Sequence, residues 1–168
     1  NEGEIEEDDP AVLFEPFYGY HRNILKLTGA TIRYVPGGEP GTPVDFDALD
    51  EVLSSHTKAV ILNTPANPSG KVWSREEMER LLSRLQTHDA VAITDEIYEY
   101  MVYDGHEHVS FASLPGAYER TITISGFSKA YNMTGWRLGY GVAPPPIADK
   151  MGLLNDLLYI CAPRPLQH

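Results

Sequence analysis

Short apolar runs recur along the chain, and most are separated by stretches in which apolar residues follow a helical repeat. Runs of about four to eight apolar, often β-branched residues are typical of buried strands. Strands that alternate with amphipathic helices are typical of an α/β domain with a largely parallel sheet. The runs that predict strands lie at 11–15, 31–35, 59–62, 91–94, 121–125 and 138–142.

Two helices are predicted together with their N-terminal caps. Ser74 and Glu77 have the spacing of a capping box, in which each side chain bonds the backbone amide of the other residue. Apolar residues then recur behind this box at i, i+3, i+4 and i+7, which predicts an amphipathic helix. Asp45 or Asp47 can cap another helix, whose apolar residues over 46–53 are expected to face inward.

Two further stretches have helical spacing. In 18–27, Ile24 and Leu27 fall on one face, which is expected to be the apolar face, and 147–160 is helical by the same criterion. The acidic stretch 1–10 is expected to be a solvated loop. Proline and glycine predict loops or breaks at 36–43, 63–70, 104–105 and 144–146.

The predicted fold is a three-layer α/β/α arrangement around a mostly parallel sheet. Asn67, Asp95 and Lys129 each come just after a predicted strand. Because the carboxyl ends of parallel strands share one edge of the sheet, we expect these three side chains to converge. Ligands of open α/β sheets bind at this edge, so it is the predicted site.

Composition limits the classes of partner. The chain has 168 residues with 42% apolar residues, which indicates a folded domain. Its 13 basic and 24 acidic residues give a net charge of −11, which disfavours nucleic acids and anionic membranes as partners. The single Cys161 excludes an internal disulfide and favours a reducing compartment, for which the cytoplasm is the expectation. No apolar run approaches the roughly 20 residues of a membrane span.

Three polar residues near strand ends are candidates for chemistry, and each also has an ordinary structural interpretation. Asp95 can cap a helix or end a Walker B strand, but the chain has no phosphate loop of the Walker A type to accompany it. Asn67 lies in a proline-frozen loop, which can be a simple turn. Lys129 can be a surface lysine, yet with Arg137 eight residues later it suits a cofactor that carries an aldehyde and a phosphate.

Two histidines are weaker candidates for a metal site. His106 and His108 flank Glu107, but no third ligand lies nearby in the sequence. We therefore expect an exposed turn after Asp104-Gly105 rather than a metal centre.

Three motifs in order carry a resemblance to a known family. N-P-S-G at 67–70, D-E-I-Y at 95–98 and S-G-F-S-K-A-Y-N-M-T-G-W-R-L-G-Y at 125–140 resemble the class I/II aminotransferases of pyridoxal-phosphate fold type I. The resemblance extends from about Val12 to the C-terminus. It implies that residues 1–168 are the central part of the cofactor-binding large domain, without its N-terminal segment and the C-terminal small domain.

The resemblance implies four roles around the cofactor ring. Lys129 is expected to hold pyridoxal phosphate covalently and, once substrate displaces it, to carry a proton from the substrate α-carbon. Asp95 is the expected partner of the pyridine nitrogen, which it keeps protonated. Tyr98 and Asn67 resemble the phenol and the amide that share the cofactor's 3′-oxygen.

Three further residues resemble ligands of the phosphate and the ring face. Arg137 and Ser128 match phosphate ligands, and Tyr18 matches the aromatic residue that stacks on the ring. Some relatives carry another hydroxyl at the position of Gly126. Whether Ser125 replaces that hydroxyl is left open by the sequence.

The activity implied is transfer of an amino group between an amino acid and a 2-oxo acid. The family also implies a homodimer in the full-length protein and little activity for this chain alone. Two alternatives share the same motifs. One is a pyridoxal-phosphate-dependent lyase or synthase of the same fold, and the other is a non-catalytic, effector-sensing domain of a transcription regulator.

Overall fold

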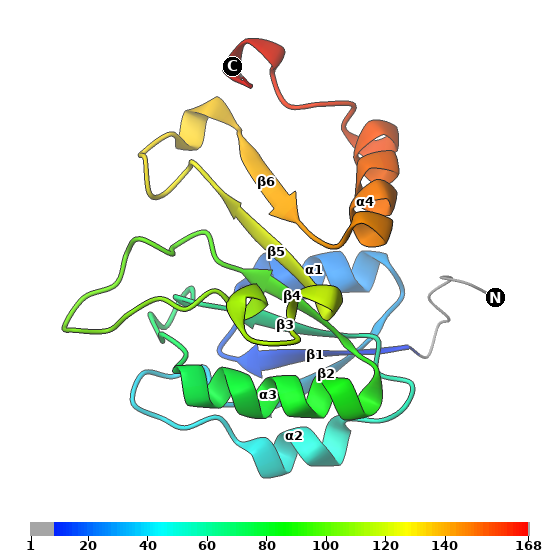
Figure 1. The fold of residues 1–168 in the computed structure, drawn as a ribbon, viewed down its shortest axis with the longest axis vertical. Coiled ribbons are helices and arrows are strands. Elements are labelled where there is room, and N and C mark those ends of the chain that lie inside the picture. The colour runs from blue at the N-terminus through cyan, green and yellow to red at the C-terminus, as the bar shows by residue number, and fades with distance from the viewer. Residues whose placement is uncertain (1–8, 168) are drawn as a thin grey trace.

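The computed structural model describes residues 9–167, in which a six-stranded sheet carries helices on both faces (Figure 1). Residues 1–8, most of the stretch expected to be a solvated loop, lie outside the described part. The strands are β1 (Pro10–Glu15), β2 (Thr31–Pro36), β3 (Ala59–Asn63), β4 (Val91–Asp95), β5 (Thr121–Gly126) and β6 (Gly139–Val142). The helices are α1 (Gly19–Leu27), α2 (Phe46–Val52), α3 (Arg75–His88) and α4 (Pro145–Leu158), with short 3-10 turns η1 (Phe111–Ser113), η2 (Tyr118–Arg120), η3 (Thr134–Trp136) and η4 (Arg164–Leu166).

The strand order is β2-β1-β3-β4-β5-β6, and the first five strands are parallel. Strand β6 is antiparallel to β5, with Gly126 opposite Gly139. The predicted three-layer α/β/α fold with a mostly parallel sheet is confirmed. The order places the carboxyl ends of β3, β4 and β5 next to one another, as the expected site requires.

Both predicted caps are present, and the structure decides between the two aspartates. The Asp45 side chain accepts a hydrogen bond from the Ala48 amide, so Asp45 rather than Asp47 caps α2. Ser74 and Glu77 form the complete capping box of α3. Helix α4 starts earlier than expected, at Pro145, because proline lacks an amide hydrogen that the first helical turn does not need.

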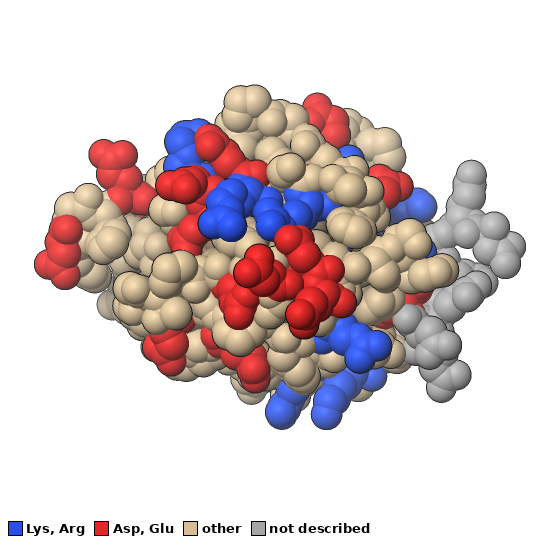
Figure 2. Space-filling view, turned by 90° about the horizontal axis from the view of Figure 1, so that it is seen from below, with Lys and Arg blue, Asp and Glu red and all other residues tan. Residues whose placement is uncertain are grey.

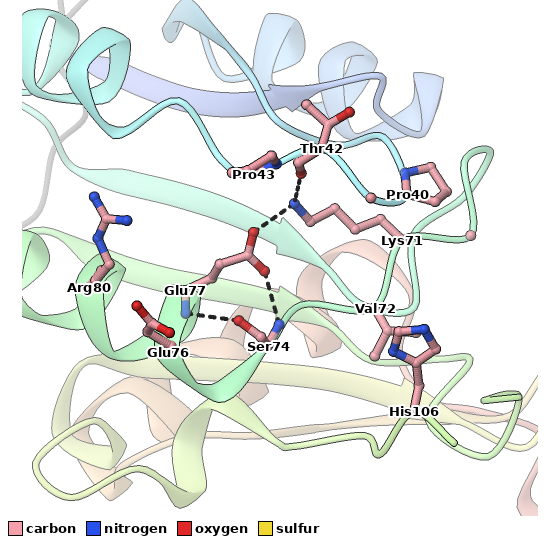
Figure 3. Close-up of a pocket in the computed structure, with 12 residues that line it drawn as sticks. Pro40, Thr42, Pro43, Lys71, Val72, Ser74, Glu76, Glu77, Arg80 and His106 are labelled. Carbon is pink, nitrogen blue, oxygen red and sulfur yellow. Dashed lines mark hydrogen bonds and ion pairs between the residues drawn. The ribbon is translucent and has the colours of Figure 1, made fainter. Parts of the chain in front are cut away.

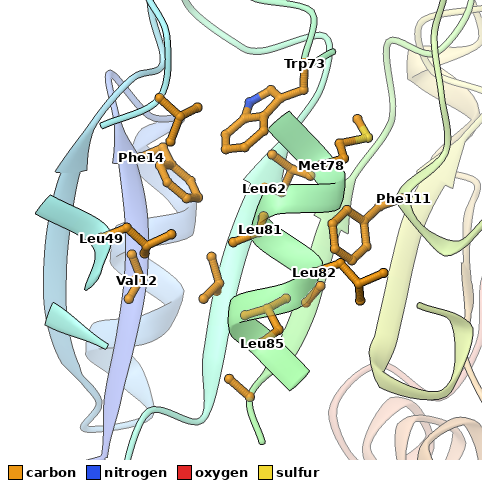
Figure 4. Packing of buried hydrophobic residues seen from close by; sticks show 14 of the residues in the cluster. Val12, Phe14, Leu49, Leu62, Trp73, Met78, Leu81, Leu82, Leu85 and Phe111 are labelled. Carbon is orange, nitrogen blue, oxygen red and sulfur yellow. The ribbon is translucent and has the colours of Figure 1, made fainter. Parts of the chain in front are cut away.

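The main core lies between the sheet and the layer of α2 and α3 (Figure 4). Phe14 of β1 packs edge-on against Trp73, with ring centroids 4.7 Å apart. Burying each such side chain contributes roughly 1.5–3 kcal/mol to folding. The apolar positions predicted for α3 all face this core, and they are Met78, Leu81, Leu82 and Leu85.

The buried face of α1 differs from the prediction. Ile24 and Leu27 are exposed, by 57% and 88%, whereas Leu25 is buried in a small cluster with Leu13 and Ile61. His21 lies four residues before Leu25 and therefore shares its face of the helix. The prediction followed the apolar residues alone and missed that a histidine takes part in the contact with the sheet.

The opposite outer face, formed by α2 and α3, carries acidic and basic side chains side by side (Figure 2). Arg84 of α3 donates from Nε and Nη2 to the two carboxylate oxygens of Asp50 in α2, at 2.6 and 2.8 Å. This hydrogen-bonded contact lowers the pKa of the Asp50 carboxyl below its ordinary value. Among residues 9–167, no helix combines the length and the apolar character needed to span a membrane.

Candidate functional site

A cleft of about 410 Å³ opens at the carboxyl ends of β3, β4 and β5. All seven residues that the sequence predicted for the site line this cleft, although they come from segments far apart in the chain. Ile97, Ile124 and Thr134 also line it and were not predicted. The full lining is Tyr18, Asn67, Asp95, Ile97, Tyr98, Ile124, Ser128, Lys129, Thr134 and Arg137.

Hydrogen bonds at the ends of β3 and β4 fix one wall of the cleft. The Asn63 side chain accepts from the Asn67 amide at 2.7 Å and donates to the Asp95 carbonyl at 2.9 Å. The Thr64 amide also donates to the Asp95 carbonyl, at 3.0 Å. The loop that carries Asn67 is therefore tied to the end of the strand that carries Asp95.

Asp95 has a partner that the sequence did not reveal. Its Oδ2 lies 3.0 Å from Nε2 of His21 in α1, and its Oδ1 accepts from the Ile97 amide at 3.2 Å. Both side chains are largely buried, with 17% of Asp95 and 14% of His21 exposed. The one available signal was a histidine four residues before Leu25, on the helix face that contacts the sheet.

Lys129 lies opposite the turn that follows β4. Its Nζ is 5.8 Å from the centroid of the Tyr98 ring, and its side chain is half-buried. An amine in this position is open to a ligand in the cleft, while the neighbouring ring limits its contact with water.

One end of the cleft is suited to an anion. Arg137 has a left-handed backbone, with φ of 54°, and its Nη1 donates to the Thr134 carbonyl at 2.8 Å. The Thr134 hydroxyl in turn donates to the Ser128 carbonyl at 2.8 Å. Thr134 thus joins the two predicted phosphate ligands, and the guanidinium keeps further N–H donors for a ligand.

The structure answers the question left open for Ser125. Its hydroxyl donates to Oε1 of Glu99 at 3.0 Å, it is buried, and it does not line the cleft. Gly126 cannot carry a side chain either, because an added Cβ would lie 2.8 Å from the Cα of Gly139. Ser125 therefore does not replace the missing hydroxyl of Gly126.

Tyr18 is the residue just before α1 and borders the cleft from the side of that helix. Its ring is 36% exposed and meets the His21 ring edge-on, with centroids 5.4 Å apart. The Tyr18 ring also stacks on Tyr20, with centroids 5.2 Å apart, so it lies between that ring and the residue that contacts Asp95.

A second hollow, of about 440 Å³, lies near the N-terminus of α3 and differs in kind (Figure 3). Two of its charged groups bond each other: Lys71 Nζ donates to the Thr42 carbonyl at 2.7 Å and to Glu77 Oε1 at 2.8 Å. Ser74 and Glu77 are the capping box of the helix. These groups stabilise the fold, so this hollow is not the candidate site.

The expectation of an exposed turn is wrong for His108. Its side chain is only 11% exposed, and its Nε2 lies 2.9 Å from Oε2 of the buried Glu96. His106 is exposed as expected. Within the described residues, no group of three or more potential ligands is arranged to hold a metal ion.

The groups in the cleft fit the cofactor that the resemblance implies. An amine is present for an aldehyde, a carboxylate for a protonated ring nitrogen, and a phenol and an amide for a ring oxygen. An arginine and a serine at the end near Thr134 suit a phosphate. The volume lies within the usual range for small-molecule sites, about 300–1,000 Å³.

Comparisons with known proteins identify the family of the chain. A family model described as aminotransferase class I and II matches residues 4–168. Human kynurenine–oxoglutarate transaminase 1 is 43% identical over 164 residues, which cover 90% of this chain and 39% of the relative. Rat kynurenine–oxoglutarate transaminase 3 is 37% identical over 177 residues, 99% of this chain and 39% of the relative.

A solved structure shows the same fold. An aromatic aminotransferase from Pyrococcus horikoshii superposes with a TM-score of 0.87 at 33% identity, over 94% of this chain and 43% of that one. The chain thus spans 39% of the length of these two curated relatives. With nearly all of its residues matched, the chain belongs to the aminotransferase class I and II family and has the fold of its fold type I members.

Proposed function

We propose that this chain is the cofactor-binding part of a pyridoxal-phosphate-dependent aminotransferase, which transfers an amino group between an amino acid and a 2-oxo acid. The observation that carries the proposal is the convergence of Lys129, Asp95, Tyr98, Asn67, Arg137, Ser128 and Tyr18 in one cleft. The printed names of the relatives, which are transaminases, support the same reaction.

The residues of the cleft would have different roles in such a reaction. Bound pyridoxal phosphate supplies an electron sink for the charge left when the substrate α-carbon loses its proton. Lys129 Nζ would bind the aldehyde and, once substrate displaces it, would be the base that carries this proton. Asp95, oriented by His21, favours a protonated ring nitrogen, and Arg137 with Ser128 binds the phosphate.

The family's other reactions use the same groups. A lyase or synthase differs in which bond of the substrate α-carbon is aligned with the ring. We favour amino transfer because of the relatives' names, whereas no feature of the described residues favours a non-catalytic effector domain.

The cofactor assignment is tested by borohydride reduction of the full-length protein loaded with pyridoxal phosphate. Peptide mass spectrometry should find the reduced adduct on Lys129, and Lys129→Ala should abolish it. Lys150→Ala, which removes an exposed lysine of α4, should keep the adduct. An adduct confined to another lysine, or failure to take up the cofactor, would refute the assignment.

The reaction type is tested separately with a panel of amino acids and 2-oxoglutarate. Transfer predicts that glutamate accumulates together with the 2-oxo acid of the donor. Loss of the donor without glutamate formation would favour the lyase or synthase instead.

Assembly and location are proposed on less direct grounds. A homodimer is expected for the full-length protein because the family implies one, and light scattering of that protein tests it. A cytoplasmic location rests on the single cysteine and stays a prediction.

A further inference from the structure

Two consecutive carboxylates, at the last residue of β4 and the first residue after it, contact different histidines. Asp95 lines the cleft and contacts His21, whereas Glu96 is buried, 2% exposed, and contacts His108. The proposed function uses only the first pair. The second pair lies directly behind residues that the cofactor would touch, so its purpose needs an explanation.

Glu96 is a buried carboxyl group with hydrogen-bond partners at both of its oxygens. Its Oε1 accepts from the Thr94 hydroxyl at 3.0 Å, and from the Ser110 hydroxyl and the Phe111 amide, both at 3.2 Å. Its Oε2 lies 2.9 Å from His108 Nε2. A buried carboxylate is tolerated only when it is hydrogen-bonded in this way.

The state of His108 follows from its two ring nitrogens. Nδ1 is buried and has no hydrogen-bond partner among the described residues, while Nε2 faces the carboxylate. An ionised carboxylate can only accept, so Nε2 carries the hydrogen. A hydrogen on Nδ1 would be a buried N–H group without an acceptor. The geometry therefore assigns the tautomer whose hydrogen is on Nε2.

The contact between Glu96 and His108 closes a long loop that carries Tyr98. The chain between β4 and η1 forms neither helix nor strand apart from turns, and Tyr98 lies in its first turn. Glu96 begins this loop, and the far end of the loop returns through His108, Ser110 and Phe111 to the same carboxylate. The loop is thus fastened at both ends by one side chain.

A second contact fastens the turn on its other side. Glu99 accepts from the Ser125 hydroxyl of β5 at 3.0 Å, and the Glu99 amide donates to the Glu96 carbonyl at 2.9 Å. Tyr98 lies between these two anchored glutamates. The direction in which Tyr98 enters the cleft therefore depends on Glu96 and its partners.

We propose that His108 is a positioning residue, which acts through Glu96 to hold Asp95 and Tyr98 in the geometry that the cofactor needs. This inference rests on the proposed function. Without His108, Oε2 of Glu96 has no donor in its buried site. The carboxylate must then turn away or admit water, and either change moves the end of β4 and the turn that follows it.

The test compares three variants of the full-length protein loaded with pyridoxal phosphate. His108→Leu removes the donor, and His108→Gln keeps an N–H group that can reach Glu96. His106→Leu is the matched control, because it removes an exposed histidine from the same loop. The readouts are the dissociation constant of the cofactor and the pH midpoint of its visible absorbance band.

We expect His108→Leu to weaken cofactor binding by about tenfold or more, as loss of a hydrogen bond to a charged group implies, and to shift the pH midpoint. His108→Gln should restore much of both values, and His106→Leu should change neither. A His108→Leu protein that binds cofactor normally, with the midpoint unchanged, would overturn the proposal. So would equal defects in the Leu and Gln variants.

Two further observations keep the test decisive. If His108→Leu fails to fold, nitrogen NMR of imidazole-labelled protein without cofactor still tests the geometry, since a His108 ring protonated on Nδ1 alone would contradict it. Failure of the proposed function is recognised independently, by the absence of the Lys129 adduct in the unsubstituted protein.

Discussion

Asp95 and His21 are 74 positions apart in the chain, yet their side chains lie within 3.0 Å of each other. Asp95 is the predicted partner of the ring nitrogen. His21 is held by α1, whose Leu25 is anchored in the small cluster on that face of the sheet. The contact with His21 restrains the orientation of the Asp95 carboxylate. His21 is therefore as much a part of the candidate site as the residues named by the motifs.

Replacing His21 by leucine tests this contact. We expect the full-length His21→Leu protein to bind pyridoxal phosphate about tenfold more weakly, because Asp95 loses a hydrogen bond to a charged group. Fluorescence titration of the cofactor-free protein measures the change. His56→Leu, at an exposed position, is the control. Equal affinities in the two variants would show that Asp95 does not depend on His21.

Sequence motifs locate residues whose types are dictated by chemistry, and they miss residues whose types are dictated by packing. Lys129, Asp95 and Asn67 follow strands whose apolar runs are plain in the sequence, so their convergence was predictable. His21 and His108 meet their carboxylates only through long-range folding. The spacing of His21 to Leu25 was the one signal for His21, and His108 was wrongly expected in an exposed turn.

At the scale of elements, the pairing of β5 with β6 determines the residue type at the end of β5, just before the loop with Ser128 and Lys129. Gly126 and Gly139 are opposite each other in this pair. An added Cβ at Gly126 would lie 2.8 Å from the Gly139 Cα and 3.0 Å from the Leu138 carbonyl oxygen. Backbone atoms cannot move aside as a flexible side chain can, so the two strands require glycine here.

Gly126→Ser should therefore destabilise the protein rather than add a phosphate contact. We expect a loss of about 1–3 kcal/mol in the free energy of unfolding, as for other overpacked sites, with no gain in cofactor affinity. Urea denaturation and a cofactor titration measure the two quantities. Gly135→Ser is the control, because a Cβ at Gly135 meets nothing within 4 Å. A tighter-binding, fully stable Gly126→Ser protein would contradict this account.

Lys71, in the loop before α3, links the start of that helix to the loop before α2, because it bonds both Glu77 and the Thr42 carbonyl. The Lys71 side chain is buried. Burial of Glu77 raises the pKa of its carboxyl, but the bonds from Lys71 and the Ser74 amide outweigh this effect. The net result is a pKa below the ordinary value of 4.5. A lowered pKa means stability that is present above 4.5 and lost as the pH falls through the lowered pKa.

Glu77→Gln should accordingly cost about 2–3 kcal/mol of stability at pH 7, and the difference from the unsubstituted chain should shrink as the pH falls below 4.5. Urea denaturation followed by Trp73 fluorescence suits the measurement, since Lys71 Nζ lies 5.4 Å from the centroid of that ring. Glu76→Gln, on the same turn but exposed, should have little effect at any pH. A difference that is constant with pH would exclude the charged contact as its cause.

For the whole molecule, the alternation of apolar runs and helical repeats was enough to predict the fold class. It did not predict that β6 runs antiparallel to β5, because the four residues of β6 carry no signal of direction. It also gave no strand order. That order arises from how α1 packs on one face of the sheet and α2 with α3 on the other, which involves contacts between distant segments (Figure 1).

The finished fold leaves apolar side chains exposed, most densely along α4. Leu153, Leu154, Leu157 and Leu158 are each more than half exposed. An apolar surface of this kind binds hydrophobic dyes and promotes self-association, whereas the net charge of −11 opposes association through repulsion. The two effects separate experimentally, because added salt screens the repulsion and leaves the apolar surface unchanged.

We therefore expect the 168-residue chain to bind a hydrophobic dye and to self-associate more strongly as salt is added. Leu157→Glu together with Leu158→Glu should lower both signals, since they remove apolar surface and add charge. Ser55→Glu with Ser83→Glu adds the same charge at exposed positions away from α4 and should weaken association while leaving dye binding intact. Dye fluorescence and light scattering at two salt concentrations provide the measurements. If both pairs of substitutions lowered dye binding equally, charge rather than the leucines of α4 would control the behaviour of the molecule.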